Sequence, residues 1–418
     1  MSKEASMFQA GDQVTSSGTT DDLTVQELPL PKDFCWVTAT AAYQVEDGAN
    51  QDGKACDHYN RVPEDIELMK ACGVDAFLNT DEFTADFSNY ARLCFDRFGD
   101  RVEKWITFNE PYIISIFGHV NGTLAPGHRV EDGFDTKNEP WRVGHTLIIS
   151  YAVAVQLHAK EFKPAQRGEI SIVLNSHFYE PYSDTQGNID AAQRRLKFYV
   201  RWFGDPIFLG KDYFVSMRNF LGDRLPHFST EERGLLRETA PLNTFYDMNH
   251  YLTKFARALP DPSSKDDWTG NIEERAVNEA GQEIGPVSQF RWLRVAPNGF
   301  RKLLNCVWER YHLPIIVTEN GCPCPGEQDL EVAVDDKFRE RYFGLYLDAI
   351  SRAIYGDGIP VKGYYVWTLM DNFEWSAGYQ PKFGIVHVNF ENGLTRTPKN
   401  STTYLCETFK QRRRGYKN

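Results

Sequence analysis

Two glutamates, each at the end of a short apolar run, are the residues of this sequence that could act together as acid and base. Residues 315–321 read Ile-Ile-Val-Thr-Glu-Asn-Gly, so Glu319 follows three β-branched residues and a threonine. Residues 105–111 read Trp-Ile-Thr-Phe-Asn-Glu-Pro and deliver Glu110 in the same way. Short apolar runs of this kind are typical of buried parallel strands. Two carboxyl groups on the ends of two well-separated strands indicate acid–base chemistry at one mouth, although either alone would more often be a solvated loop acid.

Strand-like and helix-like stretches alternate along most of the chain, and this alternation would place the two glutamates at one rim. The predicted strands begin near Trp36 and continue at residues 74–78, 105–110, 169–175, 245–251, 315–319 and 361–367. The predicted helices are residues 63–70, 80–98, 141–162, 189–203, 298–311 and 335–355, with a further helix beginning at Thr230. Alternation with polar groups at successive strand ends predicts an α/β fold, the (β/α)8 or TIM barrel. A doubly wound open sheet is the alternative, but no glycine-rich phosphate loop supports it.

The chain divides into a tail and one domain. Residues 1–28 have the polar composition of a disordered tail, and residues 29–418 form a single barrel domain in this interpretation. A polar stretch at 255–290 is predicted to be a surface loop or a small hairpin.

Composition excludes several classes of function. The net charge of −12 argues against nucleic acid as a partner, because phosphate binding needs a basic surface. No apolar run is long enough for a signal peptide or a membrane span, so we expect no membrane partner. The 8 cysteines show no disulfide framework, and Cys322 and Cys324 lack the second pair that a zinc site requires. We therefore expect no metal, no cofactor and a cytoplasmic location.

Five motifs, in this order along the chain, resemble those of the family 1 glycoside hydrolases, the β-glucosidase family. The likeness extends over nearly all of the chain from Leu30 onward and is nearest in character to the cytosolic β-glucosidases of fungi. The motifs lie at residues 41–46, 107–111, 248–251, 317–321 and 367–375.

The resemblance implies roles for both glutamates. Glu319 matches the nucleophile, which forms a covalent glycosyl-enzyme, and Glu110 matches the acid/base, which protonates the leaving oxygen and then activates water. Retaining enzymes hold these two carboxyl groups about 5–5.5 Å apart. One of the two must stay protonated while the other stays ionised.

Further matches imply contacts to the sugar ring. Asn109 matches the residue that holds the sugar 2-hydroxyl, Tyr251 matches the hydroxyl that orients the nucleophile, and Asn249 lies in the same motif as Tyr251. Trp367 matches the platform under the ring, and Phe383 lies where the family often places an aromatic wall. Taken alone, both aromatic residues would more often be ordinary core residues.

The outer hydroxyls of the sugar are assigned in the same way. Gln44, Glu374 and Trp375 match the residues that grip these hydroxyls, and Trp292 is a weaker match for the aglycone side. Alone, Gln44 could cap a turn and Glu374 could be a solvated acid. The members of the family that act on phosphorylated sugars usually lack the acid at Glu374, so the resemblance favours a neutral hexose.

A second Asn-Glu-Pro triplet, residues 138–140, repeats the one that contains Glu110. It precedes a predicted helix and does not end an apolar strand, so Glu139 is interpreted as an acid at a helix start.

The chain departs from the family between Gln44 and Glu110. The family has two further strands there, one with an arginine that pairs with the nucleophile and one with a His-Trp-Asp segment that binds the sugar. Neither occurs here, so the barrel is expected to be incomplete or distorted for lack of about one to two βα units near strands 2 and 3, at about 30 residues each. Loss of a strand leaves unpaired edges, and loss of the arginine removes a charge that would keep Glu319 ionised.

The leading hypothesis is a retaining β-glucosidase acting on a neutral β-linked glucoside or oligosaccharide. The rival is a catalytically impaired or silent barrel that binds sugars or serves as a scaffold, and a third possibility is a chain that does not fold stably. The two intact glutamates favour the enzyme, whereas the missing arginine and histidine favour the rival. The sequence leaves the aglycone and the oligomeric state open.

Overall fold

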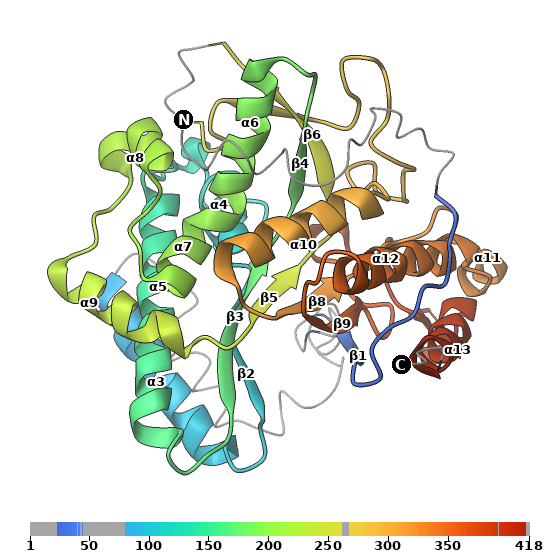
Figure 1. Cartoon of the computed structure of the whole chain (residues 1–418), viewed down its shortest axis with the longest axis horizontal. Helices are drawn as coiled ribbons and strands as arrows, with labels where there is room; N and C mark the ends of the chain where they lie inside the picture. Colours follow the sequence, from blue (N-terminus) through green and yellow to red (C-terminus); the bar gives the residue numbers. More distant parts are fainter. Residues whose placement is uncertain are drawn as a thin grey trace.

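The computed structural model describes residues 23–39, 41, 44, 80–260, 267–391 and 393–414, and Figure 1 shows their arrangement. The predicted helix at 63–70 and the predicted strand at 74–78 lie outside these described residues.

A curled sheet of six parallel strands forms the centre of the molecule, in the order β1-β9-β8-β5-β3-β2. Within the described residues, β1 and β2 each pair with one neighbour, so the sheet has two edges where a complete barrel of eight strands has none. This confirms the predicted incomplete barrel and, among the strands that the structure describes, places its opening between β1 and β2. The six strands are β1 (Cys35–Ala39), β2 (Lys104–Asn109), β3 (Glu169–Asn175), β5 (Tyr246–Asn249), β8 (Ile315–Asn320) and β9 (Val361–Trp367).

Burial distinguishes the inner strands from the two edge strands. Every residue of β5 is buried, as is all of β3 beyond Glu169. In β2, by contrast, exposed and partly buried residues alternate, and Ile106 is 49% exposed. Val37 in β1 is 37% exposed, although Trp36 beside it stacks on Phe409 with the ring centroids 4.5 Å apart. Both edges therefore leave apolar side chains in contact with solvent.

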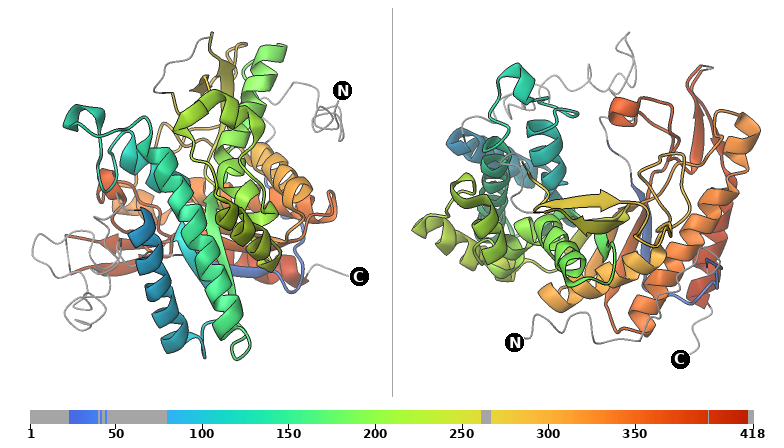
Figure 2. Two further views of the ribbon diagram at one scale, coloured as in Figure 1. Left: turned by 90° about the vertical axis from the view of Figure 1, so that its left-hand side faces the viewer. Right: turned by 90° about the horizontal axis from the view of Figure 1, so that it is seen from above.

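Helices pack beside the sheet, and the predicted ones lie close to their expected bounds. Helices α3 and α5 run side by side next to β2 and β3, while α10, α12 and α13 lie near β8, β9 and β1 (Figures 1 and 2). A π-helical turn continues α5 to Phe162, and the helix predicted at 189–203 extends through α7 to Leu209. The helices are α3 (Thr80–Phe98), α4 (Pro111–His119), α5 (Glu139–Leu157), α6 (Gln186–Leu196), α7 (Trp202–Leu209), α8 (Val215–Leu221), α9 (Thr230–Thr239), α10 (Pro297–Tyr311), α11 (Leu330–Val334), α12 (Lys337–Tyr355) and α13 (Asn400–Arg414).

Two small sheets lie outside the central one. β6 (Thr253–Ala258) and β7 (Ile272–Arg275) form an antiparallel hairpin, which matches one of the two interpretations of the polar stretch at 255–290. The hairpin is extended by β4 (Phe178–Pro181), which runs parallel to β6 and was not predicted. A second hairpin, β10 (Val386–Asn389) with β11 (Thr395–Pro398), follows the last strand of the central sheet.

The last residues of the predicted tail are hydrogen-bonded to helix α12. Within the stretch assigned to residues 1–28, the backbone N–H groups of Gln26 and Leu28 donate hydrogen bonds to the Asp348 carboxylate on α12. That carboxylate also pairs with Arg412 on α13, at 2.8 Å. Gln26 and Leu28 are thus hydrogen-bonded to the domain.

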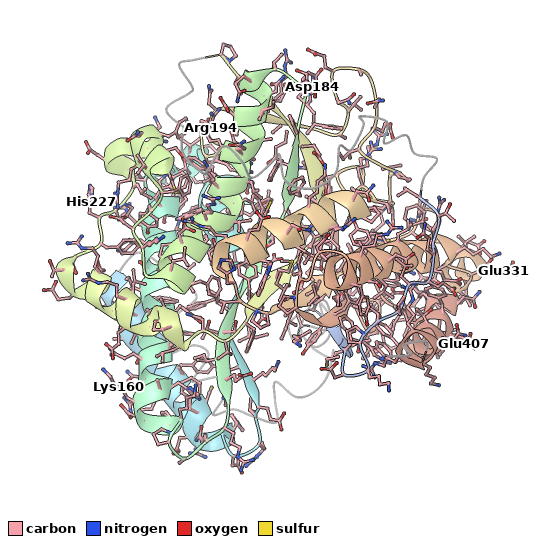
Figure 3. All side chains as sticks on the ribbon, viewed as in Figure 1. Lys160, Asp184, Arg194, His227, Glu331 and Glu407 are labelled. Atoms are coloured by element: carbon pink, nitrogen blue, oxygen red, sulfur yellow. The ribbon has the colours of Figure 1, made fainter. Side chains whose placement is uncertain are left out.

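The surface of the molecule is rich in charge. The labelled side chains of Lys160, Glu331 and Glu407 lie at its periphery (Figure 3). Among the described helices, none combines the length and apolar character required to span a bilayer.

Removing the side chain of Ile106 should cost little stability, because that side chain is half exposed on an edge strand. We expect Ile106→Ala to lower the free energy of unfolding by less than about 1 kcal/mol, and Ile172→Ala, at a buried position of β3, to lower it by about 2–5 kcal/mol. Urea denaturation of both variants measures the difference. Equal losses at the two positions would contradict the open edge at β2.

Candidate active site

Glu110 and Glu319 come from opposite sides of one rim. Glu319 lies in β8, and Glu110 directly follows β2, with β5 and β3 between these two strands. Because the strands are parallel, their C-terminal ends meet at one edge of the sheet. Glu110 has the left-handed backbone angles φ 57° and ψ 58°, and its N–H donates to the Val173 carbonyl at 2.9 Å. Such angles are uncommon for a non-glycine residue and turn the chain from β2 into α4.

The side-chain amide of Asn249 connects the two sides of the rim. Its nitrogen donates to Glu110 Oε1 at 2.9 Å and to Asn109 Oδ1 at 3.0 Å. Its oxygen accepts a hydrogen bond from Thr318 Oγ1 at 2.8 Å, next to Glu319 in β8. The same amide also lies close enough to Glu319 to lower the pKa of that carboxyl, against the rise that burial causes. The Asn249 residue is fully buried, so its amide has no water to replace these partners.

Glu319 is held by its own neighbours. The Tyr251 hydroxyl donates to Glu319 Oε2 at 2.9 Å, and the His250 N–H donates to the Glu319 carbonyl at 2.9 Å. Beyond it, the side-chain amide of Asn320 donates to Tyr342 at 2.8 Å and accepts from Tyr364 at 2.7 Å. These bonds fix the end of β8 and therefore the direction of the Glu319 side chain.

Gly321 allows the ends of β8 and β9 to approach each other. A Cβ atom at this position would lie 1.8 Å from the carbonyl oxygen of Trp367, which is far below any real contact. Glycine is therefore required immediately after the Glu319 strand. The same approach brings Trp367, which is 6% exposed, to the rim.

Hydrogen bonds join the two chain segments that carry the predicted contacts to the outer hydroxyls, one after β1 and one after β9. Gln44 Nε2 donates to the Phe373 carbonyl at 3.0 Å, and the Phe373 N–H donates to the Gln44 carbonyl at 3.2 Å. This pair places the chain after β1 beside Glu374. Burial, together with the charge of Glu110, raises the pKa of Glu374 to about 7, while a hydrogen bond from Trp367 opposes that rise.

Aromatic rings form a row from the site to the surface. Phe383 is 3% exposed and meets the Tyr251 ring edge-on, with the centroids 6.3 Å apart. Phe290 follows at 6.1 Å from Phe383 and stacks on Trp292 at 5.1 Å. Trp292 is 47% exposed and Trp375 is 41% exposed, so these two indoles are accessible to a ligand. The row is consistent with the assignment of Trp292 to the aglycone side.

The two glutamates influence each other's ionisation. Burial raises the pKa of the Glu110 carboxyl, against hydrogen bonds from Asn249 and Asn175. Burial raises the pKa of the Glu319 carboxyl well above its usual value, and the charge of Glu110 raises it further. None of the ion pairs in the described part of the chain includes Glu319. Two such groups titrate as a pair, which holds a proton at a pH where ordinary glutamates are ionised.

Asn175 is a member of the site that was not predicted. It ends β3, pairs in register with Asn249 of β5, and its side chain lies near enough to Glu110 to lower the pKa of that carboxyl. The signal was present in the sequence, because a polar residue ends the apolar run at 169–175 in the same way as Glu319 ends its own run.

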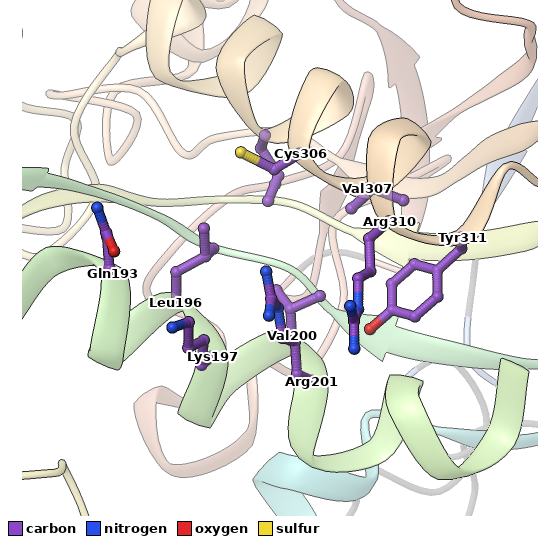
Figure 4. Close-up of a pocket in the computed structure, with 10 residues that line it drawn as sticks. Gln193, Leu196, Lys197, Val200, Arg201, Cys306, Val307, Arg310 and Tyr311 are labelled. Atoms are coloured by element: carbon purple, nitrogen blue, oxygen red, sulfur yellow. The ribbon is translucent and has the colours of Figure 1, made fainter. Parts of the chain in front are cut away.

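A separate cavity lies between the outer helices, lined from α6 and the turn after it and from α10 (Figure 4). Its lining includes Leu196, Val200, Cys306 and Tyr311, and none of the predicted site residues. It is therefore distinct from the rim that holds Glu110 and Glu319.

The fold and the rim define a class of protein. A (β/α) barrel with two facing glutamates on strand ends, tyrosine and asparagine hydrogen bonds to them, and tryptophans around them is a site of the glycosidase type. Comparison with known sequences agrees, because residues 76–414 match the profile of glycosyl hydrolase family 1. The chain belongs to glycosyl hydrolase family 1.

Individual relatives extend the match over most of the chain. Beta-glucosidase 1B of Phanerodontia chrysosporium is 34% identical over 471 positions, which cover 91% of this chain and 85% of that protein. Beta-glucosidase 42 of Arabidopsis thaliana is 33% identical, with 91% of this chain and 94% of that protein covered. The 471 aligned positions exceed the 418 residues of this chain, so the Phanerodontia protein has segments that this chain lacks.

A solved structure gives the same result. The GH1 beta-glucosidase of the fungus Humicola insolens, in complex with glucose, superposes with a TM-score of 0.83. The match is 36% identical and covers 92% of this chain and 99% of that one.

Replacing Glu319 with glutamine should stabilise the protein increasingly as the pH rises. The folded wild type binds the Glu319 proton more tightly than the unfolded chain does, so its stability falls as the pH rises from about 4.5 through the raised pKa. The Glu319→Gln variant has no carboxyl to titrate at this position, so it does not lose this free energy of unfolding. The loss in the wild type amounts to about 1.4 kcal/mol for each unit by which folding raises the pKa. Thermal denaturation at pH 4.5 and at pH 8 should show a larger gain at pH 8.

The exposed Glu279→Gln serves as the matched control and should show no such trend. A Glu319→Gln protein that is no more stable than the wild type at pH 8 would contradict the charge burial described above.

Proposed function

We propose that this protein is a retaining β-glucosidase that hydrolyses neutral β-linked glucosides or oligosaccharides. One observation carries the proposal: Asn249 hydrogen-bonds to Glu110 and Tyr251, two residues further along the chain, hydrogen-bonds to Glu319, so the two carboxyl groups lie at one rim where the charge of Glu110 raises the pKa of Glu319. Retaining glycosidases hold two such carboxyl groups about 5–5.5 Å apart, and the proposal requires that spacing here.

In the first step, Glu319 attacks the anomeric carbon while Glu110 donates its proton to the glycosidic oxygen. The bond from the anomeric carbon to that oxygen breaks, the aglycone leaves as an alcohol, and a glycosyl ester forms on Glu319. This step requires the shared proton to reside on Glu110. The hydrogen bond from the Tyr251 hydroxyl supports this distribution, because it stabilises the Glu319 anion.

In the second step, Glu110 acts as a base and removes a proton from a water molecule. The water oxygen bonds to the anomeric carbon, the ester bond breaks, and Glu319 is released as a carboxylate. The β configuration is thereby retained. Asn109, whose side chain Asn249 holds at 3.0 Å, is placed to contact the 2-hydroxyl of the sugar, where hydrogen bonds strengthen in the transition state.

The printed names of the relatives support the substrate class, since the Phanerodontia and Arabidopsis proteins are both beta-glucosidases. The acidic net charge of −12 supports a neutral substrate and not a nucleic acid. We also propose a cytoplasmic location, supported by the free thiols of the described cysteines, among them Cys94 and Cys406.

The purified chain should hydrolyse a chromogenic aryl β-glucoside and should be labelled on Glu319 by a 2-deoxy-2-fluoro-glucoside. Peptide mass spectrometry locates the label. Glu319→Ala should abolish both turnover and labelling, and Glu110→Gln should lower turnover by about 10²–10⁴-fold through loss of acid–base catalysis. Glu279→Gln, on an exposed loop, is the control that keeps turnover.

A folded sample that shows neither turnover nor label would overturn the proposal. It would indicate that the opening between β1 and β2 disables the site.

An aryl 6-phospho-β-glucoside should be a much poorer substrate than the neutral glucoside. Glu374 and the Glu110–Glu319 pair place negative charge around the sugar, and a phosphate dianion would be repelled there. Competition assays with the two substrates measure the ratio of kcat/KM. The idea fails if the phosphorylated glucoside is hydrolysed as well as the neutral one, and Glu374→Gln should narrow the difference.

A further inference from the structure

A cluster of three side chains lies at the far end of the helix that begins after Glu110. Helix α4 ends at His119, the loop that follows contains His128, and α5 begins at Glu139. Glu139 Oε1 lies 2.7 Å from His128 Nδ1 and 3.1 Å from His119 Nδ1. The three ligand atoms, one from each side chain, all lie within 4.8 Å of one another. No other set of three such side chains in the described residues does so.

We propose that His119, His128 and Glu139 form a binding site for one divalent transition-metal ion of the zinc type. Two imidazoles and one carboxylate are ligands that zinc, cobalt and nickel share. Around a tetrahedral ion with bonds of about 2.1 Å, the ligand atoms lie about 3.4 Å apart. The three side chains are near that spacing and would need only small adjustments to close on an ion.

The surroundings hold the ligands in place. The His119 side chain is fully buried, and that of Glu139 is 4% exposed. The His128 ring stacks on Phe134, with the centroids 3.7 Å apart and the planes 6° apart. The His128 N–H also donates to the Gly118 carbonyl at 2.9 Å, which folds the loop back onto the end of α4. Rigid ligands lose little entropy when an ion binds.

The cluster is largely buried, and solvent reaches it at the His128 side chain. The His128 side chain is 12% exposed, so an ion can enter there and retain a water molecule as its fourth ligand. In the absence of an ion, His128 Nδ1 is within hydrogen-bond distance of Glu139 Oε1 at 2.7 Å, and His119 Nδ1 lies 3.1 Å from the same oxygen. An ion bound through these two Nδ1 atoms leaves each Nε2 atom to carry the ring proton, so that both rings bind as neutral imidazoles.

The position of the cluster connects it to the proposed catalytic acid. The first turn of α4 is fixed by Tyr112, whose hydroxyl accepts a hydrogen bond from Arg195 at 3.0 Å. The last turn is fixed by His119 and its partners. A metal ion there would tie the end of α4 to the following loop and to α5, and so would stiffen the helix whose N-cap is Glu110. The ion is thus expected to act on stability and to take no part in the chemistry.

The test is metal retention by the purified chain. The protein is stripped with EDTA, loaded with Zn²⁺, passed through a desalting column and measured by mass spectrometry of the metal. We expect the wild type to retain about one ion per chain more than His128→Gln or Glu139→Gln. The wild-type melting temperature should rise with Zn²⁺ concentration, and those of the two variants should not.

His145→Gln is the matched control. His145 is also largely buried and faces a carboxylate, Glu232, at 3.3 Å, but it belongs to no group of three ligands in the described residues. This variant should retain the ion. Equal retention by the wild type and His128→Gln, or no retention by the wild type, would overturn the proposal.

Loading the wild type with Co²⁺ keeps the proposal testable even if the variants do not fold. Nitrogen and oxygen ligands give visible d–d absorption without the near-ultraviolet charge-transfer band that thiolates such as Cys322 or Cys324 would add. A strong charge-transfer band, or an absence of d–d bands, would contradict the site.

Discussion

The buried side-chain amide of Asn249 hydrogen-bonds to Glu110 and, through Thr318, to the strand that carries Glu319, and the rest of the rim is arranged around it. Its donor side faces Glu110 and Asn109, and its acceptor side faces Thr318. A buried amide without partners costs roughly 1–3 kcal/mol per missing hydrogen bond, so β2, β5 and β8 are held in one register by satisfying it. Acid–base chemistry at this rim therefore depends on a residue that itself exchanges no proton.

The opening of the barrel alters the electrostatics of this arrangement. In the described part of the chain, the Glu319 carboxylate accepts a hydrogen bond from a neutral group, the Tyr251 hydroxyl, which only partly offsets the burial that raises its pKa. The folded state therefore bears the cost of a buried negative charge as the pH rises. The strands next to the opening are also less buried than the inner strands, as the exposure of the Ile106 side chain shows. The buried Glu319 carboxylate that the proposed activity requires therefore lowers the stability of the folded state.

Much of the fold followed from apolar runs that end in polar residues. The strands that carry Glu110 and Glu319 and the helix at 80–98 were predicted, because each has a strong local pattern or a motif. The two free edges of the sheet, among the described residues, were expected from the family motifs that the sequence lacks before Glu110. The strand β4 and its pairing with β6 were not, since four residues carry no period and the pairing is non-local. The cluster at His119 was also missed. The spacing from His119 through His128 to Glu139 matches no known motif, and only the loop that folds back on α4 brings the three together.

The most direct test of the account is the titration of the two carboxyl groups themselves. Protein labelled with ¹³C in the glutamate carboxyl groups would be followed by infrared difference spectroscopy from pH 4 to pH 9, in the wild type and in Glu110→Gln and Glu319→Gln. The account predicts a carboxyl that stays protonated well above the usual range in the wild type and shifts to lower pH when its partner is neutralised. Two carboxyls that titrate in the usual glutamate range, each unaffected by loss of the other, would show that Glu110 and Glu319 do not form a buried, coupled pair.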